Sequence, residues 1–379
     1  MLEVADVFRE AGPAYRERFA ARMLPSHLKA MRDIERCRTA ALGGHLRQCD
    51  HCSQLLYSYH SCRNRHCPKC HGDQTRAWLD QQRARLLPCC YFLFTFTLPD
   101  PLRTLARSHQ KTVYGVLMAC AAQALSKLLA DPRWLGARPG MLAVLHSWTR
   151  AMLYHPHAHF LVTAGGLSRD GQLWRLPPRR DFLLPCRALS VIFRAKVRDA
   201  LRRAELLDQV PSHVWTTKWV VHCQHAGTGD KVLQYVARYV YRVAITNSRL
   251  ESFGHGQITF RYRDNRSRRL RHCTLPADRF IARFLQHVLP ARFTKVRYYG
   301  LFSTRSRDAL QRARSLLTQF TQPVETSRSC PDAPGDTDTA PASDLVCPLC
   351  RIGVMRIVAD LRAPPRHPTR MRSPPGPAA

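Results

Sequence analysis

Cysteine and histidine are concentrated between residues 37 and 71, and this cluster constrains the fold more than any other part of the sequence. It holds six of the 15 cysteines of the chain. Two Cys-x2-Cys pairs, Cys49 with Cys52 and Cys67 with Cys70, are separated by 14 residues, close to the spacing of a structural zinc site. These four thiolates are therefore predicted to hold one Zn²⁺ ion, on which the fold of the segment depends.

The ligand set stays open, because the segment offers more donors than one tetrahedral ion uses. Cys62 and His66 are alternative ligands, and a second ion or an exchanged ligand is compatible with the sequence. The other donors nearby are Cys37, His45, His60 and His71. Near the end of the sequence, Cys347 and Cys350 form a third pair, for which Cys330 offers only one further thiolate.

The charge balance is strongly basic, with 59 Lys and Arg against 27 Asp and Glu and a net charge of +32. Such an excess favours binding to nucleic acid, although a ribosome-like or simply basic protein has the same signature. Arg63, Arg65 and Lys69 lie among the zinc ligands and are predicted to contact DNA phosphates. The alternative is a zinc site that only holds the N-terminal part together.

Clustered thiols in a chain of this length indicate a reducing compartment rather than a disulfide scaffold. The sequence shows no signal-peptide pattern and no run of about 18 apolar residues. We therefore expect a cytoplasmic protein with no membrane partner.

Hydrophobic periodicity predicts an α+β protein with a sheet domain that carries helices on one face. Strands are expected at 91–98, 141–146, 157–164 and near 218–223, with a hairpin at 257–273, and helices at 3–35, 102–130, 187–206, 229–243 and 276–289. Of the 26 prolines, 11 lie in the last 59 residues, so the tail from residue 321 is predicted to be largely disordered.

Two histidines in the strand expected at 157–164 are candidate metal ligands. His157 and His159 are two residues apart, so both imidazoles point to one face of a strand. If segment 141–146 pairs antiparallel with this strand, His146 lies opposite His157 and supplies a third ligand. Three protein ligands leave coordination positions open for a substrate, and imidazoles suit Mn²⁺ at least as well as Mg²⁺.

The motif alone is also compatible with half-exposed histidines that bind nothing. His155 is one step further along the same face, but Pro156 disrupts regular pairing there.

Two tyrosines in the helix expected at 229–243 are candidate nucleophiles. Tyr235 and Tyr239 are one turn apart on one face, with Arg238 and Arg242 on a neighbouring face for DNA phosphates. A tyrosine hydroxyl becomes a covalent nucleophile when a metal or cation stabilises its charge. By themselves, aromatic residues at helical spacing are more often core residues.

The cysteine cluster, the histidine strand and the tyrosine helix, in this order, resemble the two-tyrosine rolling-circle insertion-sequence transposases of the IS91 type, which belong to the nucleases with a histidine-hydrophobe-histidine (HUH) motif. The resemblance covers residues 37 to about 303. The matching segments are Cys37-Arg38-Thr39-Ala40-Ala41-Leu42-Gly43-Gly44-His45, Cys62-Arg63-Asn64-Arg65-His66-Cys67-Pro68-Lys69-Cys70, His155 to Gly166, Tyr235 to Leu250, Thr259-Phe260-Arg261-Tyr262 and His287-Val288-Leu289-Pro290. Ala158 is a small occupant of the position between the histidines, and the tail after residue 320 matches nothing in this pattern.

The resemblance implies a ferredoxin-like HUH nuclease sheet domain, preceded by a helical and zinc-binding N-terminal module. It implies His157 and His159 as ligands of Mg²⁺ or Mn²⁺, Tyr235 and Tyr239 as nucleophiles, and zinc on the N-terminal cysteines. The corresponding division is a helical segment at 1–36, a zinc-binding domain at 37–75, a catalytic domain at 88–305 and the proline-rich tail at 321–379.

The implied activity is cleavage and transfer of single-stranded DNA at transposon ends and target DNA, through a 5′-phosphotyrosine and without ATP, in the bacterial cytoplasm and on the nucleoid. The alternatives are a plasmid-type rolling-circle replication initiator and a non-enzymatic zinc-dependent DNA-binding protein. The oligomeric state is not indicated by the sequence.

Overall fold

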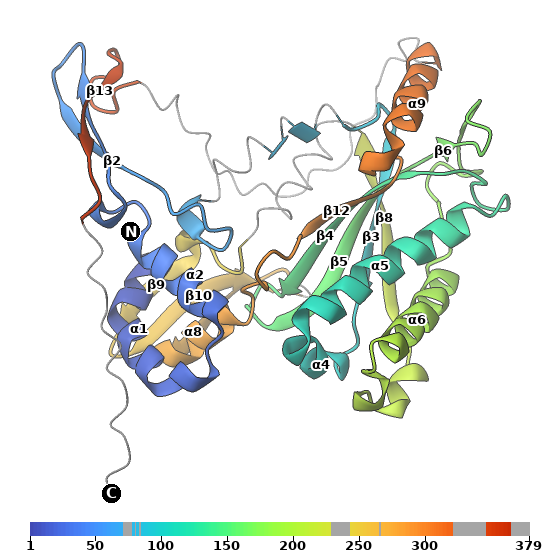
Figure 1. Ribbon diagram of the computed structural model, residues 1–379, viewed down its shortest axis with the longest axis horizontal. Helices are drawn as coiled ribbons and strands as arrows, with labels where there is room; N and C mark the ends of the chain where they lie inside the picture. The colour runs from blue at the N-terminus through green and yellow to red at the C-terminus, as the bar shows by residue number, and fades with distance from the viewer. Residues whose placement is uncertain are drawn as a thin grey trace, which may run out of the picture.

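The computed structural model describes residues 1–70, 78–79, 81–82, 85–228, 243–264, 267–320 and 346–364, which form an α+β structure (Figure 1). The helices are α1 Val4–Phe19, α2 Pro25–Arg36, α4 Leu102–Ser108, α5 Gln110–Leu129, α6 Cys186–Arg203, α8 Ala277–Leu285 and α9 Arg307–Phe320. The strands are β1 Gly44–Cys49, β2 Leu55–Tyr59, β3 Cys90–Thr97, β4 Gly140–Trp148, β5 Tyr154–Thr163, β6 Gly166–Leu167, β7 Trp174–Arg175, β8 Val220–Thr228, β9 Leu250–Gly254, β10 Gln257–Arg263, β11 Leu270–Pro276, β12 Val296–Gly300 and β13 Met355–Leu361.

The largest sheet has five antiparallel strands in the order β12-β4-β5-β3-β8. Its central strands are rich in aromatic and aliphatic residues, which suit a sheet that is covered on both faces. The expected antiparallel pairing of segments 141–146 and 157–164 is confirmed, and in its register His146 lies opposite His157. The expected ferredoxin-like form of this sheet remains a proposal.

Helices α4, α5 and α6 cover one face of this sheet (Figure 1). Phe94 and Phe96 of β3 and Phe160 of β5 point into this layer and are fully buried. Residues between them in the strands point to the opposite face, where Leu142, Val144 and Leu161 pack in one cluster with Ala313 and Leu316 of α9. Helices therefore cover both faces of the sheet, whereas the sequence had indicated helices on one face only.

The segment predicted as one helix at 102–130 forms two helices. His109 has φ −121° and ψ 46°, outside the helical region, so α4 ends there and α5 begins at the next residue. Helix α5 is long and apolar enough to cross a membrane by length and composition. It is the central core helix of the sheet layer, since 61% of its most apolar window is buried.

The N-terminal helices α1 and α2 pack against the three-stranded sheet β9-β10-β11 and helix α8, which come much later in the chain (Figure 1). Phe8 of α1 meets Phe284 of α8 edge to face, with ring centroids 5.2 Å apart. The segment 250–285 therefore shares a core with the helical N-terminus, although sequence patterns had assigned it to the catalytic domain.

A third sheet joins both ends of the chain, in the strand order β13-β1-β2. Strand β13 lies antiparallel to β1, next to the β1–β2 hairpin in Figure 1. Part of the tail thus has a defined structure, whereas residues 321–345 and 365–379, which include Cys330, lie outside the described residues.

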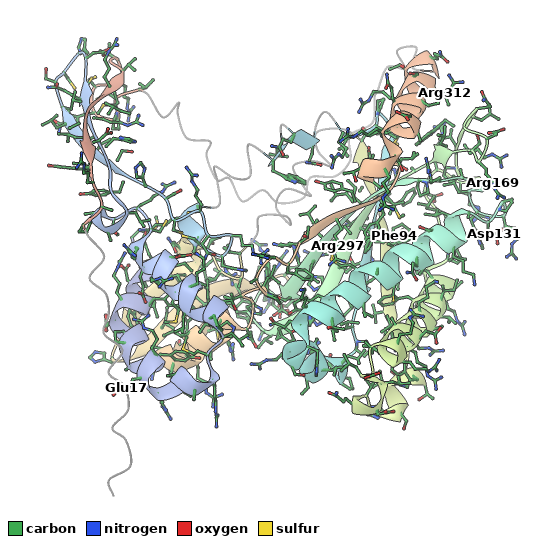
Figure 2. All side chains as sticks on the ribbon, in the orientation of Figure 1. Glu17, Phe94, Asp131, Arg169, Arg297 and Arg312 are labelled. Atoms are coloured by element: carbon green, nitrogen blue, oxygen red, sulfur yellow. The ribbon has the colours of Figure 1, made fainter. Side chains whose placement is uncertain are left out.

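Basic side chains are spread over the whole molecule. In Figure 2, Arg169 and Arg312 lie at the end of the molecule near α9, while Arg297 lies on β12. Arg312 also donates hydrogen bonds to Gly171 O and Gln172 Oε1, at 3.5 and 3.2 Å.

Candidate metal centre and thiolate clusters

His146, His157 and His159 converge on one face of the five-stranded sheet. One ring nitrogen from each lies within 4.8 Å of the others, and the ring centroids of the three pairs are 4.9 to 5.4 Å apart. The period-two alternation of β5 places His157 and His159 on this face, and the register with β4 adds His146. His146 is buried, and His157 and His159 are partly buried.

Two of these histidines form hydrogen bonds through Nδ1, so each would bind a metal through Nε2. His157 Nδ1 lies 2.7 Å from the carbonyl oxygen of His155, so that nitrogen carries the proton and donates it. His159 Nδ1 lies 3.0 Å from Thr95 Oγ1 on the neighbouring strand. Metal-binding histidines are usually oriented by such a partner on the second ring nitrogen.

Burial favours the neutral form of His157, and the neutral imidazole is the form that binds metal. Burial lowers the pKa of His157 to about 4, although the hydrogen bond to the backbone of His155 acts in the opposite direction and raises it. Three neutral imidazoles form a donor set that fits a divalent transition metal and leaves coordination positions open. The residues present therefore fit the catalytic metal that the sequence indicated.

His155 does not join the other three histidines. Its Nδ1 lies 2.6 Å from Arg103, and Arg103 also forms an ion pair with Asp100. The His155 side chain is thus held at the edge of the site, while the backbone carbonyl oxygen of His155 orients His157.

A pocket of about 330 Å³ lies beside the histidines. Trp148 lines it and stacks on His146, with ring centroids 4.9 Å apart. Lys295 also lines it, and its Nζ lies 5.0 Å from the centre of the Trp148 ring. Burial lowers the pKa of Lys295 to about 7. Arg65, His66, His287 and Thr294 also belong to the polar part of the lining.

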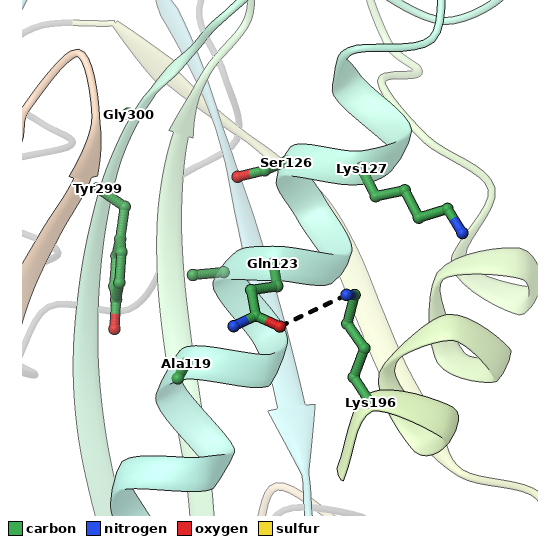
Figure 3. Close-up of a pocket in the computed structure, with 8 residues that line it drawn as sticks. Ala119, Gln123, Ser126, Lys127, Lys196, Tyr299 and Gly300 are labelled. Carbon is green, nitrogen blue, oxygen red and sulfur yellow. Dashed lines mark hydrogen bonds between the residues drawn. The ribbon is translucent and has the colours of Figure 1, made fainter. Parts of the chain in front are cut away.

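A second, more open hollow of about 600 Å³ lies between α5, α6 and β12 (Figure 3). Lys196 donates to Gln123 Oε1 at 3.4 Å in it, and Gly300 lies at its rim. Gly300 pairs with Gly140, at the end of β4 opposite to His146. This hollow is therefore separate from the histidine site.

The candidate nucleophiles Tyr235 and Tyr239, with Arg238 and Arg242, lie outside the described residues. The chain leaves the described part at Thr228, the end of β8, and re-enters it at Val243. Val243 and Ala244 line the same pocket as Trp148 and Lys295.

Eight cysteines form two groups of four, and in each group the Sγ atoms lie within 4.8 Å of one another. The groups are Cys37, Cys62, Cys67 and Cys70, and Cys49, Cys52, Cys347 and Cys350. This corrects the predicted grouping of Cys49 and Cys52 with Cys67 and Cys70. The six-residue strand β1, about 20 Å long, carries the Cys49–Cys52 turn away from the first group.

The group formed by Cys37, Cys62, Cys67 and Cys70 has the geometry of a tetrathiolate zinc site. Zn–S bonds of about 2.3 Å in a tetrahedron place sulfurs about 3.8 Å apart, whereas a disulfide requires about 2.0 Å. Cys70 Sγ lies 3.5 Å from Cys37 Sγ and 3.6 Å from Cys62 Sγ. The backbone N–H groups of Cys62 and Asn64 donate to Cys37 and Cys62 Sγ, both at 3.4 Å, and favour the thiolate form.

Several residues predicted to bind zinc or DNA have partners inside the protein. His66 Nε2 accepts the backbone N–H of Leu289 at 3.2 Å, so His66 is outside the cysteine group. Arg65 donates to the carbonyl oxygens of Phe293 and Pro290, at 2.5 and 2.9 Å. Lys69 forms an ion pair of 2.5 Å with Glu3.

These contacts give Arg65 and Lys69 a role in joining the zinc-binding segment to the rest of the protein, which the sequence did not indicate. Arg63, the third predicted contact for phosphate, is exposed.

Comparison with known proteins supports the same organisation. Residues 7–98 match a family model described as "Transposase zinc-binding domain", and residues 140–309 match one described as "Putative transposase". The chain is also 37% identical over 390 residues to "Putative transposase y4qJ" of Sinorhizobium fredii, an alignment that covers 96% of this chain and 97% of that protein. The chain belongs to the IS91 family of transposases.

A further relative is the "Transposase for insertion sequence element IS801" of Pseudomonas savastanoi pv. phaseolicola, which is 29% identical over 78% of this chain and 79% of its own length. No solved structure matches the chain. In this transposase the zinc-binding match includes the group of Cys37, Cys62, Cys67 and Cys70 and supports structural Zn²⁺ there. The histidine site lies within the other matched segment.

Proposed function

We propose that this transposase cleaves and rejoins single-stranded DNA by tyrosine transesterification at the histidine site. The observation that carries the proposal is the convergence of His146, His157 and His159 on one sheet face, with the Nδ1 atoms of His157 and His159 already hydrogen-bonded. The antiparallel sheet that presents them, with its main helical layer on the opposite face, supports the proposal of an HUH nuclease domain of ferredoxin-like type.

His146, His157 and His159 would hold the catalytic ion, Mg²⁺ or Mn²⁺. When bound, this ion supplies Lewis-acid stabilisation of the scissile phosphate. Tyr235 or Tyr239 then attacks phosphorus through its phenolic oxygen. A bond forms between that oxygen and the 5′-phosphate, the bond from phosphorus to the 3′ oxygen breaks, and the 3′ oxygen takes up a proton. A 3′-hydroxyl reverses this step on a new strand, so no ATP is consumed.

The position of the tyrosine segment in the chain supports this role. Val243 and Ala244 follow it directly and line the pocket next to His146. Tyr239 is four residues from Val243 in the sequence. If segment 229–243 is helical, as the sequence predicts, Tyr235 and Tyr239 share one face and both hydroxyls can serve one site, with Arg238 and Arg242 at the DNA phosphates.

The pocket chemistry favours a single-stranded DNA substrate. Trp148 gives this pocket an aromatic wall for an unpaired base, and Lys295 lies at the same pocket for a phosphate. Burial lowers the pKa of Lys295 to about 7 in the protein without DNA. A phosphate bound beside Lys295 would favour its protonated form. The membership in a transposase family favours the transposon ends and target DNA over a plasmid origin as substrate.

The test is covalent trapping on labelled single-stranded oligonucleotides that span the element ends. With Mn²⁺ or Mg²⁺, the wild-type protein is expected to form an adduct whose peptide maps to Tyr235 or Tyr239 by mass spectrometry. Tyr235→Phe with Tyr239→Phe should form none, because both nucleophiles are absent. Each single variant should still cleave but fail complete transposition, and Tyr241→Phe is the matched control.

Two outcomes would contradict the proposal. An adduct in the double variant, or on an unrelated residue, would exclude the two tyrosines as nucleophiles. Wild-type cleavage by His157→Ala or His159→Ala, in conditions where EDTA stops the wild-type protein, would exclude the histidine site as the metal centre.

A further inference from the structure

The described part of the tail returns to the N-terminal zinc-binding segment. Strand β13 pairs with β1 from Gly44 opposite Leu361 to Cys49 opposite Met355. Strand β1 is thus the middle strand of a sheet whose two edges come from opposite ends of the sequence (Figure 1). This pairing brings the Cys347–Cys350 turn to the Cys49–Cys52 turn.

The four thiols at this junction have the spacing of a tetrahedral site. Cys49 Sγ lies 3.7 Å from Cys350 Sγ, and Cys52 Sγ lies 3.7 Å from Cys347 Sγ. These separations match the edge of about 3.8 Å expected for four sulfurs around zinc and are far longer than a disulfide bond. Both Cys-x2-Cys pairs sit in tight turns, which present two thiolates to one ion.

Backbone N–H groups surround the sulfurs as they do in metal-binding turns. Cys52 N donates to Cys49 Sγ at 3.5 Å, and Gly353 N donates to Cys350 Sγ at 3.4 Å. The hydrogen bond from Gly353 N, with a second one from Ile352 N, favours the thiolate form of Cys350. A Cβ atom at position 353 would lie 2.5 Å from Cys49 Sγ, so glycine is required for this close approach.

The small sheet has very little apolar core of its own. Among the described residues, its buried cluster consists of Cys49, Cys347 and Met355, with Cys350 packed against them. The apolar side chains of Leu55, Tyr57, Ile357 and Val358 are exposed instead. A sheet this poorly packed requires another source of stability, and a structural metal is the usual one.

A specific polar contact aligns the two turns. Asp50 accepts the backbone N–H of Val354 at 2.7 Å and forms an ion pair of 3.2 Å with Arg356. Cys347 N also donates to Gly353 O at 2.8 Å within the tail turn. The tail therefore docks in one register, which a nonspecific association of a proline-rich segment would not give.

We propose that Cys49, Cys52, Cys347 and Cys350 bind a second structural Zn²⁺ ion, which fastens the C-terminal segment to the N-terminal zinc-binding domain. The first two ligands lie inside the matched zinc-binding segment at 7–98, and the last two lie far outside it. The zinc-binding module of this transposase thus consists of two sites, and the second is complete only when both ends of the chain contribute.

Zinc content of the full-length protein tests this directly, in a His157→Ala/His159→Ala background that removes the other metal site. We expect two zinc ions per chain in this parent protein, and one after Cys347→Ser/Cys350→Ser. Cys120→Ala, a matched change of a buried cysteine outside both groups, should leave two. With Co²⁺ in place of zinc, the thiolate-to-cobalt charge-transfer absorption should fall by half in the serine variant, because four of eight thiolates remain.

A single zinc ion per chain in the parent protein would overturn the proposal. Two zinc ions per chain in the serine variant would overturn it as well. A Cys62→Ser variant keeps the test informative if the tail changes lower solubility, because it should lose the first ion and retain the second.

A cut chain tests the fastening itself. A specific protease site is placed between residues 321 and 345, and the cut protein is passed over a size-exclusion column. The C-terminal fragment should elute with the rest of the protein when zinc is bound and separate after treatment with a strong chelator. A fragment that separates in the zinc-loaded protein would show that the tail is not held by the metal.

Discussion

Thr95 determines how one candidate metal ligand is oriented. Its Oγ1 lies 3.0 Å from His159 Nδ1, across the pair between β3 and β5. Thr95→Val removes this hydrogen bond while keeping the shape of the side chain. We expect the variant to bind Mn²⁺ about 10-fold to 100-fold more weakly, the usual effect of losing a partner of a ligating histidine.

The matched control is Thr97→Val, on the same strand and opposite His157. Because His157 Nδ1 is held by the carbonyl oxygen of His155, this change should leave metal affinity near the wild-type value. Isothermal titration of both variants with Mn²⁺ decides the matter, and equal losses in the two would assign the effect to general disturbance of the strand.

His287 is predicted to make stability depend on pH. Its Nε2 lies 3.1 Å from Met152 O and its Nδ1 lies 3.3 Å from Ser147 Oγ, and burial lowers its pKa to about 4. The unfolded chain takes up a proton near pH 6.5, while the folded protein does so only near pH 4. Between these values the unfolded state binds more protons, so acidification favours unfolding.

Urea unfolding between pH 7 and pH 4 measures this effect. The contribution of His287 should be constant above about pH 6.5 and fall by up to about 1.4 kcal/mol per pH unit below it. His287→Gln should be less stable at pH 7 but show a shallower loss on acidification. A variant with the wild-type slope would show that other buried histidines carry the pH dependence.

At the scale of elements, the contact between α1 and α8 joins distant parts of the chain into one core. Phe8 is fully buried and Phe284 is 2% exposed, and their rings meet edge to face. Phe8→Ala is expected to lower the free energy of unfolding by about 3 to 5 kcal/mol. Phe19→Ala, at the partly exposed end of α1, should cost clearly less.

A double-mutant cycle of Phe8→Ala and Phe284→Ala, followed by chemical unfolding, isolates the contact between the two rings. A coupling energy of about 1 kcal/mol is expected for such an aromatic pair. Strict additivity of the two substitutions would mean that the two helices are stabilised independently.

The elements that sequence could predict are those with local signals. The period-two alternation of His157 and His159 specifies a strand face, and the short connection to segment 141–146 restricts their pairing, so the position of His146 was predictable. Strands β1, β2 and β13 have few buried apolar residues and gave no such signal.

The cysteine groups were harder to predict because their members are far apart in the chain. Cys52 and Cys347 are 295 residues apart, and the spacing of Cys49 and Cys52 fits a site with Cys67 and Cys70 equally well. The third pair at Cys347 was the available signal: an isolated Cys-x2-Cys pair requires partners elsewhere. The internal partners of Arg65 and Lys69 depend on tertiary packing and had no sequence signal.

At the scale of the whole molecule, the net charge of +32 predicts that DNA binding depends steeply on salt. If about six phosphates are neutralised, the logarithm of the affinity for single strands should fall with a slope of about −4 against the logarithm of the salt concentration. Fluorescence anisotropy of labelled oligonucleotides, titrated at salt concentrations between about 50 and 200 mM, measures this slope. A flat response, or tighter binding to matched duplex than to single strands, would contradict this prediction.

The pairing of β1 with β13 also sets the order in which the protein can be completed during synthesis. Cys49 and Cys350 are 301 residues apart, so at about 5 to 20 residues per second the first turn waits about 15 to 60 s for its partner to leave the ribosome. Until then the edge of β1 that will receive β13 has no partner from its own chain. A message that ends before residue 347 yields a protein that can carry the histidine strand but cannot form the pairing of β1 with β13.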